Sequence, residues 1–133
     1  DMIRMGVTQD WSTHMIGHEL TALCGIAHGA SLAIVMPGTM RILRKQKWEK
    51  LLQYAERVWG LEGGSEEERV EQAIRETEVF FEALGLATHL ADAGIPETVI
   101  DTIADRFNED EVLYGECRNV DGEVAREILR SRL

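Results

Sequence analysis

Long apolar runs are missing from this chain of 133 residues, and so is any excess of basic residues. Its 14 Lys and Arg are outnumbered by 24 Asp and Glu, and the net charge of −10 disfavours nucleic acid or an anionic membrane surface as a partner. No apolar run approaches the roughly 18 residues of a membrane-spanning helix, so no membrane association is expected. The opening DMIRMGVTQD also lacks the pattern of a signal peptide.

Cysteine is scarce as well. Cys24 and Cys117 are the only two, and their spacing suits neither a disulfide framework nor a C-x-x-C motif, so we expect a reducing, cytoplasmic location. Cys24 lies in an apolar stretch, and we interpret it as a core residue rather than a metal ligand. The chain fits one domain, residues 1–133. Because it begins at Asp1 without an initiator methionine, we expect it to be a fragment of a longer protein.

Period-two alternation, the mark of a half-buried strand, is absent, and apolar residues recur at helical spacing instead. The sequence therefore predicts an all-α fold, a helical bundle. The second helix is expected to end near Met36, where Pro37 and Gly38 kink or break it. The predicted helices begin near Asp10 or Ser12, His28, Gln46, Ser65, Pro96 and Asp121.

Two of these helices carry clear starting signals. Ser65-Glu66-Glu67-Glu68 has the pattern of a capping box, and Asp121 is an N-cap residue for the last helix. The inner faces follow from the periodicity, which places Val58 in the third helix and Phe80 and Leu84 in the fourth among the buried residues.

The stretch Gln9–Pro37 holds three of the four histidines: His14, His18 and His28. His14 and His18 are four residues apart and would share one face of a helix. Gly25 is a typical helix terminator, so a second helix starting near His28 can fold back over the first. Spacing leaves two alternatives open, a site of metal or acid–base chemistry and a set of hydrogen-bonded structural histidines.

Several enzyme motifs are excluded. The zinc-protease pattern H-E-x-x-H is absent because Glu19 follows the second histidine, and the inverted pattern fails because Gly17 stands where a glutamate is needed. No P-loop, G-x-G-x-x-G or G-x-S-x-G motif occurs. The acidic run Glu66–Glu68 is expected to be a solvated helix start, and the isolated His89 to be structural or exposed.

The segment GVTQDWSTHMIGHELTALCGIAHGASLAIVMP resembles the histidine signature of the iron-containing alcohol dehydrogenases. It is most similar to their butanol dehydrogenase and NADPH-dependent aldehyde reductase branch. The similar features are the DW before the first histidine, the H-x-x-x-H-E-L, and the A-H-G that leads to a proline. KLLQYAERVWG and FFEALGLATHLADAGI match the same branch, so the resemblance covers nearly the whole chain.

The resemblance implies that this chain is the later part of a C-terminal, all-helical, metal-binding domain. It implies that His14 and His28 are metal ligands for Fe²⁺ or Zn²⁺, and that His18 assists substrate or proton handling. The family's other two ligands, an Asp-x-x-x-His pair, and the N-terminal domain that binds NAD(P)H are absent from this sequence. A small aldehyde or alcohol is the implied substrate.

Two functional hypotheses follow. One is the metal-binding portion of an NAD(P)H-dependent alcohol dehydrogenase, inactive on its own, in which the metal polarises the carbonyl or alkoxide oxygen. The other is a non-enzymatic helical interaction or dimerisation module with structural histidines. The helices around His14 and His28 would face the missing upstream part, so the fragment is expected to expose apolar surface there, which predicts a homodimer or a self-associating fragment.

Overall fold

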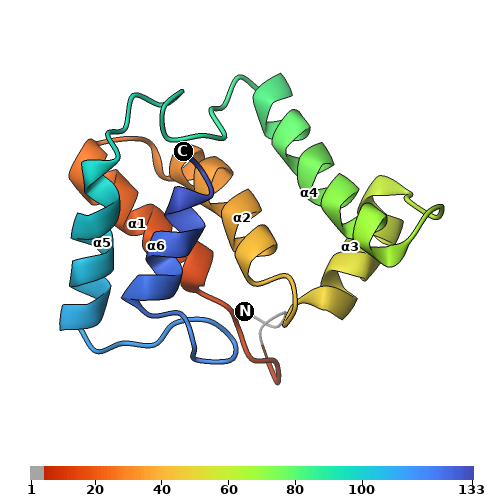
Figure 1. Cartoon of the computed structure of the whole chain (residues 1–133), viewed down its shortest axis with the longest axis horizontal. Coiled ribbons are helices and arrows are strands. Elements are labelled where there is room, and N and C mark those ends of the chain that lie inside the picture. The colour runs from red at the N-terminus through yellow and green to blue at the C-terminus, as the bar shows by residue number, and fades with distance from the viewer. Residues whose placement is uncertain (1–4) are drawn as a thin grey trace.

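The computed structural model describes residues 5–133, which form six helices (Figure 1). Asp1–Arg4, part of the stretch in which no signal peptide was expected, lie outside the described residues. Within residues 5–133 the only strand-like pairing is an isolated antiparallel bridge between Tyr114 and Val120, so the predicted all-α fold is confirmed. None of these helices is both long and apolar enough to cross a membrane. The helices are α1 (Ser12–Cys24), α2 (His28–Ile42), α3 (Trp48–Trp59), α4 (Glu66–Ala83), α5 (Thr98–Glu109) and α6 (Gly122–Arg130).

The helices form two packed groups. α1, α2, α5 and α6 make the main body, and α3 and α4 form a hairpin that joins this body where α4 packs on α2 (Figure 1). A small second core lies between α2, α3 and α4 and contains Met40, Leu51, Val70 and Ile74. The main core is made by Ile16, Leu20, Ile34, Val35, Leu43, Leu90, Ile95, Ile100, Ile103, Phe107, Val120, Ala125, Ile128 and Leu129.

α2 does not end at Met36, as the sequence predicted, but continues through Pro37 to Ile42. A proline in a helix interior forfeits one backbone hydrogen bond, because it has no N–H to donate. Tertiary packing compensates here, since Pro37 and Gly38 are both buried. A Cβ on Gly38 would lie 2.8 Å from the backbone oxygen of Ile128, so glycine permits the close crossing of α2 and α6. The expected break was wrong because this contact outweighs local propensity.

The predicted N-terminal caps of α4 and α6 are confirmed. Ser65 Oγ accepts a hydrogen bond of 3.2 Å from the Glu68 N–H, and Glu68 Oε2 accepts one of 2.8 Å from the Ser65 N–H. Asp121 Oδ1 accepts a hydrogen bond of 3.0 Å from the Val124 N–H. Each cap satisfies backbone donors that the first turn of a helix leaves unpaired. Short-range sequence signals therefore place these two helix starts correctly.

Two helices begin slightly later than predicted. α3 starts at Trp48 rather than Gln46, and α5 starts at Thr98 rather than Pro96. Before α5, the Val99 N–H donates to the Pro96 carbonyl oxygen at 3.1 Å, three residues back. This tighter turn leads into the α-helix, a common arrangement at helix ends.

The inner faces of α3 and α4 were only partly predicted. Val58 is 59% exposed, Phe80 49% and Leu84 63%, although periodicity had placed all three inside. Val58 and Phe80 line an apolar pocket of about 310 Å³ between α2, α3 and α4. This pocket is open to solvent, because no helix of residues 5–133 packs over these two side chains. The periodicity identified an apolar face correctly, but it could not show that this face lacks a covering element.

Candidate metal centre

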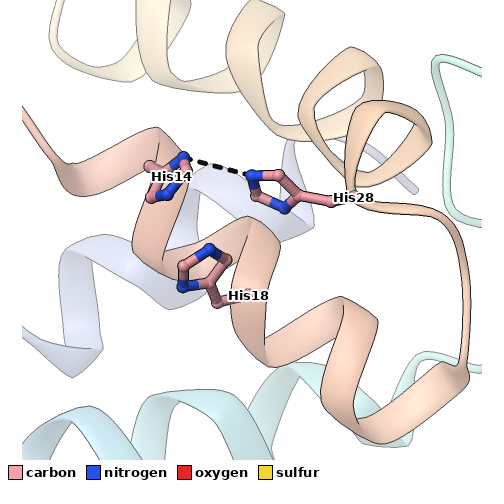
Figure 2. Close-up of side chains that lie close together, drawn as sticks. All are labelled: His14, His18 and His28. Carbon is pink, nitrogen blue, oxygen red and sulfur yellow. Dashed lines mark hydrogen bonds between the residues drawn. The ribbon is translucent and has the colours of Figure 1, made fainter.

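Three histidines from two consecutive helices meet at one point of the main body (Figure 2). His14 and His18 project from the same side of α1, one turn apart, and His28 is the first residue of α2. Gly25 ends α1 with a φ of 69°, the left-handed conformation that favours glycine, and the chain then turns back. The structure thus brings together the three histidines that the sequence singled out.

The rings are close enough to act on one bound group. Nδ1 of His14 lies 3.1 Å from Nε2 of His28, and one nitrogen from each of the three rings lies within 4.8 Å of the others. Ring centroids are 4.2 Å apart for His14 and His18, and 4.6 Å apart for each ring and His28. Among residues 5–133 this is the one group of three or more potential ligands that meets such a geometry.

The surroundings of His14 favour its neutral imidazole. Burial lowers the pKa of His14, and charge on His18 or His28 would lower it further by repulsion. His14 and His28 are half-buried, whereas His18 is exposed. Because a histidine must be neutral to bind a metal ion, the lowered pKa of His14 suits a ligand.

The donor set fits a divalent metal ion. Two imidazole nitrogens bound at about 2.1 Å are separated by about 3.4 Å in a tetrahedral site and about 3.0 Å in an octahedral one. The 3.1 Å between His14 Nδ1 and His28 Nε2 falls between these values. The spacing therefore suits a shared metal ion and does not distinguish Zn²⁺ from Fe²⁺.

The neighbouring polar residues do not join the cluster. Glu19, next to His18, forms an ion pair of 2.8 Å with Arg106 of α5, so its carboxylate is engaged elsewhere. Cys24 packs against the main core, as predicted, and burial raises the pKa of its thiol. His89 lies apart from the cluster and has Arg132 Nη2 3.4 Å from its Nε2. These contacts leave an all-imidazole donor set.

A network of charges fixes the first turn of α1, where His14 lies. Asp10 Oδ1 accepts a hydrogen bond of 2.8 Å from the Ser12 N–H, and Asp10 Oδ2 accepts one of 2.5 Å from Lys47 Nζ. Lys47 also binds Glu116 at 2.9 Å. Burial alone would raise the pKa of Asp10, but the bonds from Lys47 and Ser12 outweigh it and lower that pKa. The predicted cap of this helix was wrong, because Trp11 and not Asp10 or Ser12 holds the N-cap position, but Asp10 still satisfies the backbone N–H of Ser12 from two residues before it.

Trp11 is a neighbour of the site that sequence reasoning did not assign to it. The ring of Trp11 meets the ring of His14 edge-on, with centroids 5.2 Å apart, and 43% of Trp11 is exposed. Its position three residues before His14 was the available signal, because side chains at that spacing are neighbours on a helix. Trp11 forms an apolar rim on the His14 side of the cluster.

Fold and cluster together define an all-helical domain with three histidines gathered where two helices meet. The whole chain, residues 1–133, matches the model of the Fe-containing alcohol dehydrogenase family, C-terminal. The chain belongs to this family. It is 45% identical over 128 residues to the NADPH-dependent aldehyde reductase YqhD of Escherichia coli, covering 96% of this chain and 33% of that protein.

Other relatives lie in the butanol dehydrogenases. The probable NADH-dependent butanol dehydrogenase 1 of Bacillus subtilis is 33% identical over 134 residues, which cover 99% of this chain and 34% of the relative. This chain thus spans about one third of the length of these relatives.

Solved structures show the same fold. The substrate- and cofactor-free form of YqhD matches with a TM-score of 0.92 at 44% identity, over 96% of this chain and 34% of that one. NADH-dependent butanol dehydrogenase A of Thermotoga maritima matches with a TM-score of 0.83 at 33% identity, over 92% of this chain and 33% of that one. The arrangement of the six helices is therefore that of the helical part of these enzymes.

Proposed function

We propose that this chain is the metal-binding helical portion of an NAD(P)H-dependent alcohol dehydrogenase or aldehyde reductase. The observation that carries the proposal is the 3.1 Å approach of His14 Nδ1 to His28 Nε2, in a chain 45% identical to an NADPH-dependent aldehyde reductase. A divalent metal ion, Fe²⁺ or Zn²⁺, would polarise the oxygen of a small aldehyde or alcohol during hydride transfer. Imidazole ligands suit both ions.

The three histidines take different roles in this proposal. His14 and His28, both half-buried, would hold the metal ion through Nδ1 and Nε2. The lowered pKa of His14 keeps its imidazole neutral at physiological pH and so available as a ligand. His18 is exposed beside them, where it can exchange protons with water and with the substrate oxygen.

The remaining parts of the enzyme lie outside this chain in the proposal. NADH or NADPH would be bound by another part of a longer polypeptide, and so would the additional metal ligands. The two cofactors appear in the names of different relatives, NADPH for YqhD and NADH for the butanol dehydrogenases, so the names leave the choice open. Hydride chemistry belongs to the cofactor, while the helical domain supplies the ligands and orientation.

A chimaera tests the proposal. In it, the matching part of E. coli YqhD is replaced by this chain, and bound metal and butanal-dependent oxidation of NADPH are measured. We expect one metal ion per chain and turnover. His14→Ala and His28→Ala should lose both, while His18→Ala should keep the metal and lose about 10²–10⁴-fold in turnover.

The fourth histidine provides the matched control, because His89→Gln removes an imidazole away from the cluster and should leave metal content and turnover unchanged. Full metal content and turnover in the His14→Ala/His28→Ala double variant would refute the metal assignment. In that event the histidines are structural, as in the alternative of a non-enzymatic helical interaction module.

A further inference from the structure

We infer that Gly17 is a positioning residue, which sets how closely His28 approaches His14 and His18. Gly17 lies on α1 between the two histidines of that helix and is buried at the crossing with α2. Metal ligation by His14 and His28 is the proposed function, and only the expected change in Zn²⁺ affinity rests on it. The effect of Gly17 on the position of His28 is expected in the metal-free protein as well.

The space at Gly17 is already filled by α2. A Cβ built there would lie 2.9 Å from Ser31 Oγ, 3.1 Å from Leu32 Cδ2 and 3.7 Å from His28 Cε1. The first of these distances is shorter than real Cβ contacts, so any larger residue at position 17 must displace the Ser31 hydroxyl, which belongs to the first turn of α2. That segment begins with His28.

The Ser31 side chain has little room to move away from a Cβ at position 17. Its side chain is completely buried, and its Oγ donates a hydrogen bond of 2.7 Å to the His28 backbone oxygen. A methyl group at position 17 would press on this hydroxyl, and through it on the backbone that carries His28. Protein interiors are close-packed, so such pressure shifts the backbone or forces a strained rotamer.

A small displacement matters because ligand constellations tolerate only about 0.5 Å of error. The three rings touch at centroid distances of 4.2 to 4.6 Å, so moving α2 away from α1 by this amount opens the cluster on its His28 side. His14 and His18 would keep their mutual spacing, since both belong to α1. Gly17 therefore controls the two ring distances that involve His28 and not the distance between His14 and His18.

The first test needs no metal. Nuclear Overhauser effects between carbon-bound ring protons of His28 and those of His14 and His18 are measured in the 133-residue chain. Because the effect falls with the sixth power of distance, Gly17→Ala should weaken the cross-peaks to His28 roughly twofold or more for a shift of about 0.5 Å. The cross-peak between His14 and His18 should keep its intensity and serves as the internal reference.

Gly29→Ala is the matched control. It lies next to His28 in the first turn of α2, and a Cβ at Gly29 would meet nothing within 4 Å. Both substitutions give the same gain in helix propensity. Gly29→Ala should leave all ring cross-peaks unchanged, so a loss confined to Gly17→Ala reports the contact with α2 and not a general change in helix stability.

Ser31→Ala tests the steric origin. Removing Oγ frees the space that a Cβ at position 17 would enter, so in a Ser31→Ala background the further change Gly17→Ala should leave the His28 cross-peaks unchanged. This comparison also stands if Gly17→Ala alone fails to fold. Weakened His28 cross-peaks in that background, or unchanged ones in the single variant Gly17→Ala, would overturn the inference.

Zinc titration adds the functional consequence. Gly17→Ala should weaken Zn²⁺ affinity at least about tenfold relative to Gly29→Ala, because misplaced ligands cannot share one ion. If the wild-type chain binds no Zn²⁺ through its histidines while the cross-peaks behave as expected, the proposed function fails and the positioning role of Gly17 stands. Equal affinities in the two alanine variants, with the wild-type chain binding through His14 and His28, would overturn the inference.

Discussion

Nδ1 of His14 lies 3.1 Å from Nε2 of His28, although the two residues are 14 positions apart in the chain. The contact exists because α1 ends at Gly25 and α2 begins at His28, which places the start of the second helix beside the face of the first. A neutral imidazole can donate a proton from one of its ring nitrogens, so this distance suits a hydrogen bond between the two rings in the metal-free protein (Figure 2). The same distance suits two ligands of one metal ion, which would take the place of that proton.

We expect the isolated chain to bind Zn²⁺ and Fe²⁺ weakly. A complete structural zinc site contributes about 10–16 kcal/mol at neutral pH, and a site held by two imidazoles, His14 and His28, should forfeit a large part of that. Calorimetry with Zn²⁺ and, without oxygen, with Fe²⁺ should give dissociation constants in the micromolar range or weaker.

In the same titrations, His14→Ala and His28→Ala should abolish the residual binding, while His89→Gln should leave it unchanged. Tight one-to-one binding by a monomer that either alanine substitution abolishes would show that the site is complete within this chain.

The isolated chain should not reduce butanal with either NADH or NADPH. The described helices hold candidate metal ligands, whereas the hydride donor would be bound by another part of the polypeptide. Absorbance of the reduced cofactor at high protein concentration, with added Zn²⁺ or Fe²⁺, checks this. Turnover that disappears in His18→Ala would contradict it, because that result would place a working active site in these 133 residues.

Much of the fold could be predicted because helix signals are local. The capping box at Ser65 and the N-cap at Asp121 act within four residues of chain, and both are confirmed. The continuation of α2 through Pro37 could not be predicted, because it depends on packing against Ile128, about ninety positions further on. The exposure of Phe80 likewise depends on which element covers it, and periodicity carries no such information.

The residues of the candidate site also fall into those that local sequence predicts and those that only the packing of the helices reveals. His14 and His18 follow from a spacing of four residues, and His28 from the helix terminator that precedes it. Trp11 could have been added from its spacing of three residues to His14. Gly17 could not, since its importance comes from the contact with α2, which exists only once the two helices cross.

Asp10 should contribute stability that depends on pH. Its folded-state pKa is lowered, so the contribution is present above the unfolded-state value of about 3.9 and is lost as pH falls through the folded-state pKa. Asp10→Asn should lower the free energy of unfolding by about 1–2 kcal/mol at pH 7, and the difference from wild type should shrink below about pH 4.

Urea unfolding between pH 2 and 7 measures this difference, with the exposed Glu62→Gln as the charge-matched control. A difference that stays constant down to pH 2 would show that the ionised Asp10, bound to Lys47 and Ser12, is not its source.

Arg132 should be a large stabiliser near the end of the chain. Its side chain is 1% exposed, lies 2.6 Å from Glu78 of α4, and donates hydrogen bonds of 3.0 and 2.8 Å to the Thr88 carbonyl oxygen. Arg132→Ala leaves the mostly buried Glu78 without this partner and the Thr88 oxygen without its donors. We expect a loss of about 3 kcal/mol in the free energy of unfolding.

Arg130→Ala is the control for this loss, because Arg130 is half-exposed and its contact with Asp101 is 3.9 Å long. It should change the free energy of unfolding by no more than about 0.5 kcal/mol. Similar effects of the two substitutions in urea unfolding would contradict the assigned role of Arg132.

The α3–α4 hairpin should mediate self-association of the chain. Val58 and Phe80 expose apolar side chains in the pocket of about 310 Å³ that Met36 and Phe81 help to line, and Leu84, just after α4, is exposed as well. Contiguous apolar surface of this kind is seldom left bare in a monomer, because burying it releases about 25 cal/mol for each Å². The chain should therefore form dimers or larger assemblies as its concentration rises from about 1 to 100 μM, a range in which weak apolar contacts begin to hold.

Phe80→Lys should shift light-scattering masses toward the monomer, whereas Gln72→Lys, an equal change of charge at an exposed position of the same helix, should not. A wild-type chain that stays monomeric over this range would show that the exposed apolar surface of the hairpin does not drive association. Equal effects of the two lysine substitutions would show that association depends on charge rather than on apolar contact.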